Sequence, residues 1–398
     1  TMGNGLTSTY QYDFANRLSK ITTGANIQET TFGYDKLGNK LSVNRINYPA
    51  WSEQMTYDAN ARLTNFNRGS SLQNNYTYDN LGNRVRANIN GVNNTYIINN
   101  LNQLTSVNGT PLQYDERGNL VFDGVYHKFY NGAGQLIKDS SGINNVHTYT
   151  YDAFGRRVTK TIAGVSYKYT YSGLTAVEER DAADQILNQT VFADFLNPVL
   201  NKKNNASFYY HRNELGSTEA VTDAGGQLAE RYLYDAYGKP SIFNSSNQPV
   251  AGSVTGNRFG LTGQEYDSAT ASYRFFYRTY SPDLGIFNQR DLIEYEDGMG
   301  MYQYVGNNPA NGLDILGLKD CYKEKNNTDK KVVEYFVLTG SVAVGTPKFI
   351  LVKVLKTISE EVGDKAGLVA LPFNVIDNVT RSVDFVSEFS DRSTMTNI

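Results

Sequence analysis

Histidine and cysteine, which often act as bases, nucleophiles or metal ligands, are scarce in this sequence of 398 residues, with three and one. His127, His147 and His211 show no metal-ligand spacing, so we expect them to be structural, and no phosphate-binding glycine loop or Gly-x-Ser-x-Gly elbow is present. The single cysteine, Cys321, excludes an internal disulfide framework and a cysteine-rich zinc site. We therefore expect no metal ion and no other cofactor. The remaining candidates are carboxyl groups, which catalyse hydrolysis when two of them lie close enough to share a proton.

The composition indicates which elements must position such groups. The chain has 30 Tyr and 35 Gly against 9 Pro and 5 Met, which is typical of many short aromatic strands joined by tight turns. Its formal charge of -3 provides no basic field, so no nucleic-acid partner is predicted. The longest apolar stretch, from Val332 to Val344, is too short to span a membrane, and no transmembrane segment is expected.

An internal repeat organises most of the chain. The best-formed unit reads Tyr-Asp-x-x-Gly-Asn followed by Arg or Lys and a hydrophobic residue, as in Tyr78 to Val85 and Tyr34 to Leu41, and degenerate copies occupy Tyr96 to Leu104 and Tyr130 to Leu136. Successive Tyr-Asp pairs begin at Tyr12, Tyr34, Tyr57, Tyr78, Tyr114, Tyr151 and Tyr234.

Each unit predicts a strand, a turn and a second strand. Alternating tyrosines such as Tyr76 and Tyr78 place one face of a strand against its neighbours. The Asp is expected to accept hydrogen bonds from amides of its own turn, and the Gly-Asn pair to supply positions that tolerate a positive φ. A single hairpin cannot bury its aromatic face, so the hairpins must stack along a continuous sheet.

These segments resemble the YD repeats of RHS-repeat proteins, which are similar to the repeats of teneurins and of the shell-forming subunits of insecticidal toxin complexes. The resemblance covers about residues 10 to 318. Its most specific part resembles the RHS core segment and consists of ordered motifs at Phe208–Ser217, Ala220–Asp223, Tyr232–Gly238, Leu261–Asp267, Tyr277–Pro282, Gly285–Phe287, Tyr302–Pro309 and Asp314–Leu318.

The resemblance implies an all-β fold, in which a spiralling strip of hairpins forms part of a hollow shell around a variable C-terminal effector or toxin. We expect repeats in residues 1–207, the core segment in 208–318, and a small mixed α/β module in 319–398. Because the sequence opens inside a repeat and its first ten residues lack a secretory signal, we expect it to be the C-terminal part of a longer bacterial protein.

The resemblance also selects a pair of carboxyl groups. Asp291 and Asp314 stand 23 residues apart, where the family carries paired aspartates that resemble an aspartic protease acting on its own chain. The expected cut lies between Leu318 and Lys319, and Arg290 is expected to balance the charge or to fix the ionised partner.

The family has proline after both aspartates, whereas this chain has Leu292 and Ile315. Proline restricts the backbone, so its loss would loosen the presentation of the pair or of the cut bond. Two hypotheses therefore remain open, namely self-cleavage and a structural remnant in which both aspartates only cap turns.

The composition changes after Leu318, because residues 319–398 contain only two of the 30 tyrosines and four of the 35 glycines. Residues 319–331 suit an exposed linker, 332–338 a strand and 348–362 a helix. The tail has no histidine and its charges balance, which disfavours a His-dependent nuclease.

The function predicted from the sequence is encapsulation and delivery of this C-terminal module. Its partners would be the module as cargo, an immunity protein and secretion machinery, and the protein would be secreted or at the cell surface. The alternative is a non-catalytic surface protein whose tyrosine-rich sheets bind carbohydrate or mediate adhesion.

Overall fold

The computed structural model describes residues 2–318 and 320–322. Two antiparallel sheets contain most of the chain, and each strand pairs with the strand that follows it in sequence. The expected all-β strip of hairpins is thus confirmed, whereas the expected α/β module lies outside the described residues. The first sheet consists of β1 Ser8–Tyr12, β2 Leu18–Thr23, β3 Gln28–Tyr34, β4 Lys40–Arg45, β5 Glu53–Tyr57, β6 Leu63–Arg68, β7 Leu72–Tyr78, β8 Arg84–Ile89, β9 Val92–Ile98, β10 Leu104–Val107 and β11 Thr110–Pro111.

The second sheet continues the strip with fifteen strands. It runs past residue 207 without a break, so the expected boundary between repeats and core segment falls within β22. The strands are β12 Gln113–Tyr114, β13 Leu120–Phe122, β14 His127–Tyr130, β15 Leu136–Ser140, β16 Val146–Tyr151, β17 Arg157–Ile162, β18 Val165–Ser172, β19 Thr175–Arg180, β20 Ile186–Asp194, β21 Asn197–Lys203, β22 Ala206–Arg212, β23 Thr218–Thr222, β24 Leu228–Tyr234, β25 Pro240–Asn244 and β26 Pro249–Val250.

The rest of the core segment forms two small sheets and short helical turns. Their bounds are β27 Glu265–Asp267, β28 Ser272–Arg274, β29 Thr279–Ser281, β30 Ile286–Phe287, β31 Gly312–Asp314 and β32 Asp320–Tyr322, with 3-10 turns η2 Leu261–Gly263, η3 Glu294–Asp297 and η4 Val305–Asn307. The strip itself adds α1 Gly24–Ile27 and η1 Pro49–Trp51. Within the described part of the chain, no helix has the length and apolarity needed to cross a membrane.

The turn after each Tyr-Asp pair is built by the aspartate, as expected. In the unit of Asp79, its Oδ1 accepts hydrogen bonds from the amides of Leu81 and Asn83 at 2.9 and 2.8 Å. The positive φ of this turn falls on Gly82 alone, at 84°. Asn83, which was expected to tolerate a left-handed backbone, does not adopt one. Its side chain closes the turn instead, because its Nδ2 donates to Asp79 Oδ2 at 3.0 Å.

The tyrosines join one hairpin to the previous one. Tyr76 lies in the core with 5% of its surface exposed. The hydroxyl of Tyr78 donates to the Leu63 carbonyl at 2.6 Å, and Tyr34 and Tyr57 donate in the same way to Leu18 and Lys40. Each of these repeat tyrosines therefore satisfies a backbone acceptor on an earlier strand while it buries its ring, which explains why Tyr is used here rather than Phe.

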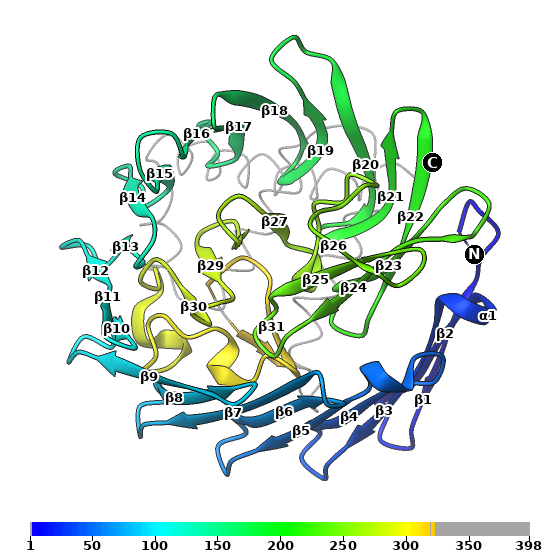
Figure 1. The fold of residues 1–398 in the computed structure, drawn as a ribbon, viewed down its shortest axis with the longest axis horizontal. Helices are drawn as coiled ribbons and strands as arrows, with labels where there is room; N and C mark the ends of the chain where they lie inside the picture. Colours follow the sequence, from blue (N-terminus) through cyan, green and yellow to red (C-terminus); the bar gives the residue numbers. More distant parts are fainter. Residues whose placement is uncertain (1, 319, 323–398) are drawn as a thin grey trace, which may run out of the picture.

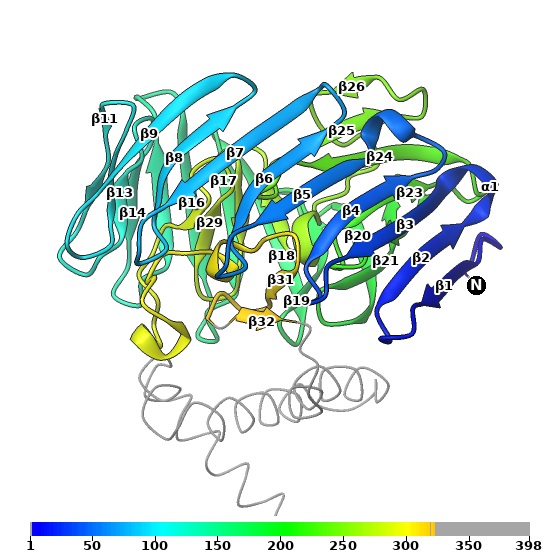
Figure 2. The same ribbon diagram turned by 90° about the horizontal axis from the view of Figure 1, so that it is seen from below.

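The strip curls into a ring, and the yellow core segment lies inside it (Figure 1). The ring is joined where β23 and β24 return to the first sheet: Glu219 accepts from Gln28 Nε2 at 2.5 Å and from Arg45 Nε at 3.0 Å. Arg231 donates to the Ile27 carbonyl at 2.8 Å. Figure 2 shows β1 to β9 as the near wall of this ring, with β29 and β31 behind it.

The core segment is held by an aromatic cluster. Tyr273, Phe275, Tyr280, Phe287 and Tyr304 are each at most 1% exposed; Tyr273 stacks on Tyr280, and the other rings contact one another edge-on or tilted. The hydroxyls of Tyr273 and Tyr280 donate to carbonyls of the strip, at Gly238 and Tyr237. This packed interior positions the loop that contains Asp291 and the end of β31 at Asp314.

Candidate active site

The two predicted aspartates come together inside the core segment. Asp291 lies in the loop that follows β30, and Asp314 is the last residue of β31. Both are buried, with 7% and 0% of their surface exposed. Arg278 joins them, because its Nη1 lies 2.7 Å from Asp291 Oδ2 and its Nη2 lies 3.3 Å from Asp314 Oδ2.

Asp314 holds the turn that leads to the expected cleavage point. Its Oδ1 accepts hydrogen bonds from the amides of Leu316, Gly317 and Leu318, at 3.2, 2.7 and 3.2 Å. Arg278 Nε donates to the Gly317 carbonyl at 2.6 Å. The same carboxylate and the same guanidinium therefore bind the peptide groups directly before the bond between Leu318 and Lys319. Leu318 is buried, and Lys319 is outside the described residues.

Glycine is required in this turn. Gly317 has a φ of 78°, and a Cβ atom at this position would lie 2.9 Å from the Cβ of Phe275. The Asp-x-x-Gly-Leu pattern at the end of the core segment is thus explained by packing as well as by backbone conformation.

Burial perturbs both carboxyl groups. It raises the pKa of Asp291 to about 6, although Arg278 and the amide of Ile293 act in the opposite direction. It also raises the pKa of Asp314, against Arg278 and the three turn amides. With both carboxyls ionised, the two aspartates and one arginine have a net charge of -1 in a buried place, so a single proton makes the group neutral.

Arg290 does not take the role expected of it. Its side chain is exposed and its Nη2 lies 3.5 Å from Glu294, which is a surface contact. Arg278 occupies that role instead, stacked over the ring of Phe287 at 3.7 Å. The sequence contained a signal for it, since Arg278 belongs to the motif Tyr277-Arg278-Thr279-Tyr280, but nothing in the linear order relates it to Asp291 or Asp314.

The two residues that replace the family's prolines have different environments. Leu292 is 42% exposed, whereas Ile315 packs beside the buried Leu316 and Leu318 and its carbonyl accepts from Gln264 Nε2 at 2.9 Å. The turn after Asp314 is therefore held by side-chain hydrogen bonds without a proline.

The histidines have structural surroundings. His127 stacks on Phe122, His147 Nδ1 lies 2.6 Å from Asp139 Oδ1, and His211 Nε2 lies 2.8 Å from Thr222 Oγ1. Burial lowers the pKa of His211 to about 4.

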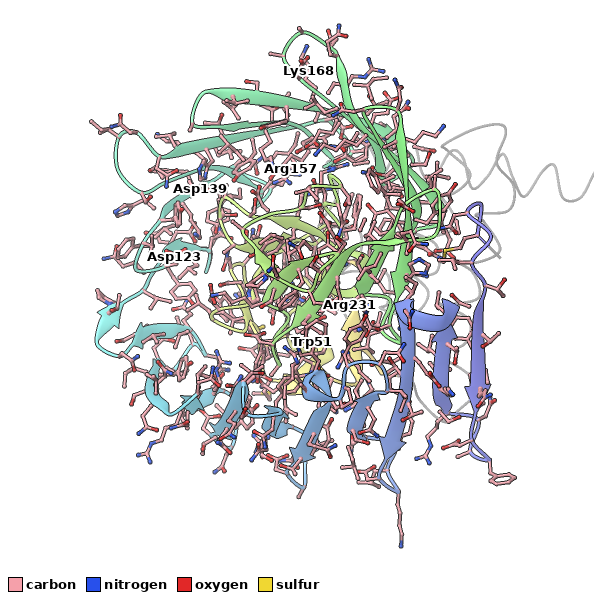
Figure 3. The ribbon with its side chains drawn as sticks, turned by 45° about the vertical axis from the view of Figure 1, so that its right-hand side comes forward. Trp51, Asp123, Asp139, Arg157, Lys168 and Arg231 are labelled. Carbon is pink, nitrogen blue, oxygen red and sulfur yellow. The ribbon has the colours of Figure 1, made fainter. Side chains whose placement is uncertain are left out.

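Asp139 and Arg157 lie on the inner side of the strip, whereas Lys168 is at its outer side (Figure 3). No group of three metal-ligating side chains occurs in residues 2–318 and 320–322.

The fold and the repeat define a YD-shell protein. The family model of the Teneurin YD-shell matches residues 4–310, so the chain belongs to the Teneurin YD-shell family. It is 31% identical over 254 residues to the tRNA3(Ser)-specific nuclease WapA of Bacillus spizizenii, covering 61% of this chain and 11% of that protein. It is 26% identical over 380 residues to the toxin subunit YenC1 of Yersinia entomophaga, covering 81% of this chain and 38% of that protein.

Solved structures agree on the fold. The crystal structure of TcdB2-TccC3-Cdc42 matches with a TM-score of 0.67 at 20% identity, over 79% of this chain and 18% of that chain. The expected relationship to YD-repeat shells of toxins and teneurins is confirmed. The chain spans only about a tenth of the length of the first of these relatives.

Proposed function

We propose that this chain forms part of a YD-repeat shell that encloses and delivers the module in residues 319–398, and that Asp291 and Asp314 release the module by cutting after Leu318. The observation that supports cleavage is the position of Arg278, which contacts both carboxylates and the Gly317 carbonyl at once. Such a pair would supply the two groups that hydrolysis of this bond requires, a carboxylate to activate water and a carboxyl to donate a proton.

The proposed step is the addition of water to the Leu318 carbonyl. The ionised carboxylate takes a proton from the water, and the oxygen of the water bonds to the Leu318 carbonyl carbon. The protonated carboxyl then supplies a proton to the Lys319 nitrogen as the carbon–nitrogen bond breaks. The products are a Leu318 carboxylic acid and a Lys319 amine, between which one proton passes to give a carboxylate and an ammonium, and the aspartate pair ends with one proton, as it began.

The hydrogen bonds assign the two roles. Asp314 accepts from three amides and from Arg278, which favours its ionised form. Asp291 accepts from one amide and from Arg278, so fewer donors oppose its protonation, and burial raises its pKa to about 6. Asp314 is therefore the proposed base and Asp291 the proposed acid, so cleavage should be faster at pH 5.5 than at pH 8.

Packaging is proposed from the relatives. Their names describe different toxins, among them a tRNA nuclease, a double-stranded DNA deaminase toxin and a toxin subunit. A common shell with exchangeable activities fits this variety, and secretion or cell-surface display, secretion machinery and an immunity partner belong to the same proposal.

The carbohydrate alternative depends on exposed aromatic rings. Tyr76, Tyr149 and Tyr169 are instead 5%, 3% and 6% exposed, although Tyr10 and Tyr12 of the first strand are open to solvent. A glycan array with the purified chain tests this alternative, and specific sugar binding that is lost on changing Tyr10 and Tyr12 to Ala would favour adhesion over packaging.

Intact mass spectrometry tests self-cleavage. The parent chain, incubated at pH 5.5 and pH 8, is expected to give a fragment that begins at Lys319, and the Asp291→Asn, Asp314→Asn double variant is expected to stay whole. Asp283→Asn is the matched control, because Asp283 is an exposed carboxylate of the core segment paired with Lys239. An uncut parent at both pH values would leave the structural-remnant hypothesis. Co-elution of the released fragment with residues 1–318 in gel filtration would support packaging, and its separate elution would count against it.

A further inference from the structure

The hairpin turn between β20 and β21 differs from the Tyr-Asp turns of the repeat. Its two residues are Phe195 and Leu196, and the residues that flank them, Asp194 and Asn197, pair with each other. Leu196 has a φ of 59°, a left-handed conformation that Gly82 takes in the turn described above. A branched aliphatic residue is strained in this conformation, and tight hairpin turns favour glycine or asparagine there. Contacts from elsewhere in the fold must therefore hold this turn.

The core segment supplies such a contact at the backbone of the turn. A Cβ atom at Gly263, whose φ is 78°, would lie 2.1 Å from the Leu196 carbonyl oxygen, so glycine is what allows the turn to approach so closely. Arg212 Nη1 donates to the same oxygen at 3.4 Å. Gly263 is followed by Gln264, whose side chain binds the Ile315 carbonyl. The turn of the strip thus contacts the part of the core segment that holds the chain just before the proposed cut.

The side chain of Phe195 extends this contact to the residues beside the cut bond. It packs against the buried apolar cluster of Ile293, Leu316 and Leu318, as does Phe276 of the core segment. The three residues of the cluster are each at most 8% exposed. The side chain of Leu318, the residue whose carbonyl would be attacked, is therefore enclosed by apolar groups to which the strip contributes Phe195 and the core segment Phe276.

An enclosed side chain beside a cut bond can determine which residue is accepted there. In an apolar pocket, one methylene group more or less changes the rate of a reaction about 10–200-fold. The side chain of Leu318 fixes the peptide group that would be hydrolysed, while Asp314 and Arg278 bind the Leu318 amide and the Gly317 carbonyl. The apolar and polar contacts together hold this peptide group in one orientation, which hydrolysis by a fixed pair of carboxyl groups requires.

We propose that Phe195 and Phe276 are specificity-determining residues, which form a pocket that selects leucine at the position before the cut bond. This inference rests on the proposed self-cleavage. Because Phe195 belongs to the strip and Phe276 to the core segment, the pocket is complete only when the two are packed together. Cleavage is thereby limited to a chain whose strip has folded around its core segment. The strain at Leu196 is retained because the turn has this role.

Cleavage of the full chain during cell-free synthesis tests the pocket, with the fragment that begins at Lys319 followed over time by intact mass spectrometry. Leu318→Met nearly conserves the volume of the side chain and should be cleaved within about threefold of the parental rate. Leu318→Ala and Leu318→Phe should each be cleaved at least about tenfold more slowly, because the first leaves the pocket partly empty and the second is too large for it.

A compensating change separates the effect of the pocket from misfolding. Adding Phe195→Ala to Leu318→Phe makes room for the larger ring, so cleavage should become at least about threefold faster than in Leu318→Phe alone. Phe14→Ala is the matched control, because Phe14 is an exposed phenylalanine in the turn between β1 and β2. Adding it to Leu318→Phe should leave the rate unchanged.

The outcomes distinguish this inference from the proposed function. An uncut parent would overturn the proposed self-cleavage and this inference with it. A cleaved parent whose Leu318→Phe variant is cleaved at the parental rate would overturn the inference alone. The same holds if Phe195→Ala gives Leu318→Phe no faster cleavage than Phe14→Ala does.

Discussion

Removal of Arg278 is the most direct test of the buried site. The change Arg278→Met keeps much of the length of the side chain but removes the charge between Asp291 and Asp314, each of which is at most 7% exposed. Breaking a buried ion pair by deleting one partner costs about 3–5 kcal/mol, since the remaining charge stays buried. At pH 8, where both carboxylates are ionised in the unfolded chain, we expect the free energy of unfolding to fall by this amount.

The stability that Arg278→Met loses should be greater at pH 8 than at pH 5. Arg278 lowers the pKa of both aspartates, so its removal raises their folded-state pKa values further above those of the unfolded chain. A carboxyl with a raised folded pKa contributes stability that is present below its unfolded pKa and is lost as the pH rises through its folded pKa. At pH 5 the variant can protonate both groups, and the remaining loss should be about 1–3 kcal/mol from hydrogen bonds such as that to the Gly317 carbonyl.

Urea denaturation at pH 5 and pH 8, followed by circular dichroism, measures both values. Arg290→Met is the control, because its exposed contact with Glu294 should contribute less than about 1 kcal/mol. Adding Asp291→Asn to Arg278→Met should recover part of the loss at pH 8. An equal loss at both pH values would refute the electrostatic reasoning and would leave packing against Phe287 as the role of Arg278.

Three other perturbations probe the same geometry. Because the pKa of Asp291 is raised to about 6, the free energy of unfolding of the parent should decrease between pH 5 and pH 7. Asp291→Asn should make this decrease smaller in urea denaturation. An unchanged pH dependence would contradict the raised pKa of Asp291. Tyr78→Phe should lower the free energy of unfolding by about 1 kcal/mol, because it loses the hydrogen bond to the Leu63 carbonyl. Tyr78→Ala should lower it by roughly 3 kcal/mol or more, because it also removes the buried ring. Equal losses of stability in the two variants would argue against a contribution from the hydroxyl. Gly317→Ala should lower the melting temperature and slow any cleavage, because it places a Cβ atom on a left-handed backbone beside Phe275. A variant that melts and is cleaved like the parent would show that the turn accommodates the side chain.

The repeating element and the contacts that fold it can be predicted from the amino-acid sequence. The alternation of Tyr76 and Tyr78, the aspartate that caps its own turn and the glycine at the left-handed position are local features within one hairpin. Local features follow from backbone geometry and side-chain type, so they can be predicted without knowledge of distant contacts. The resemblance of the core motifs to a family also predicts the pair of Asp291 and Asp314.

The residues that meet across the ring depend on how the strip and the core segment pack. Arg278 rather than Arg290 lies between the aspartates, because β28 and β29 bring it there from 13 and 36 positions away in the chain. Arg84 differs from Lys40 and Arg157 in what the core segment places opposite it, although all three occupy the same position of the repeat. The curl of the strip and the packing of the core segment inside it set these distances, and no period or spacing along the sequence records them.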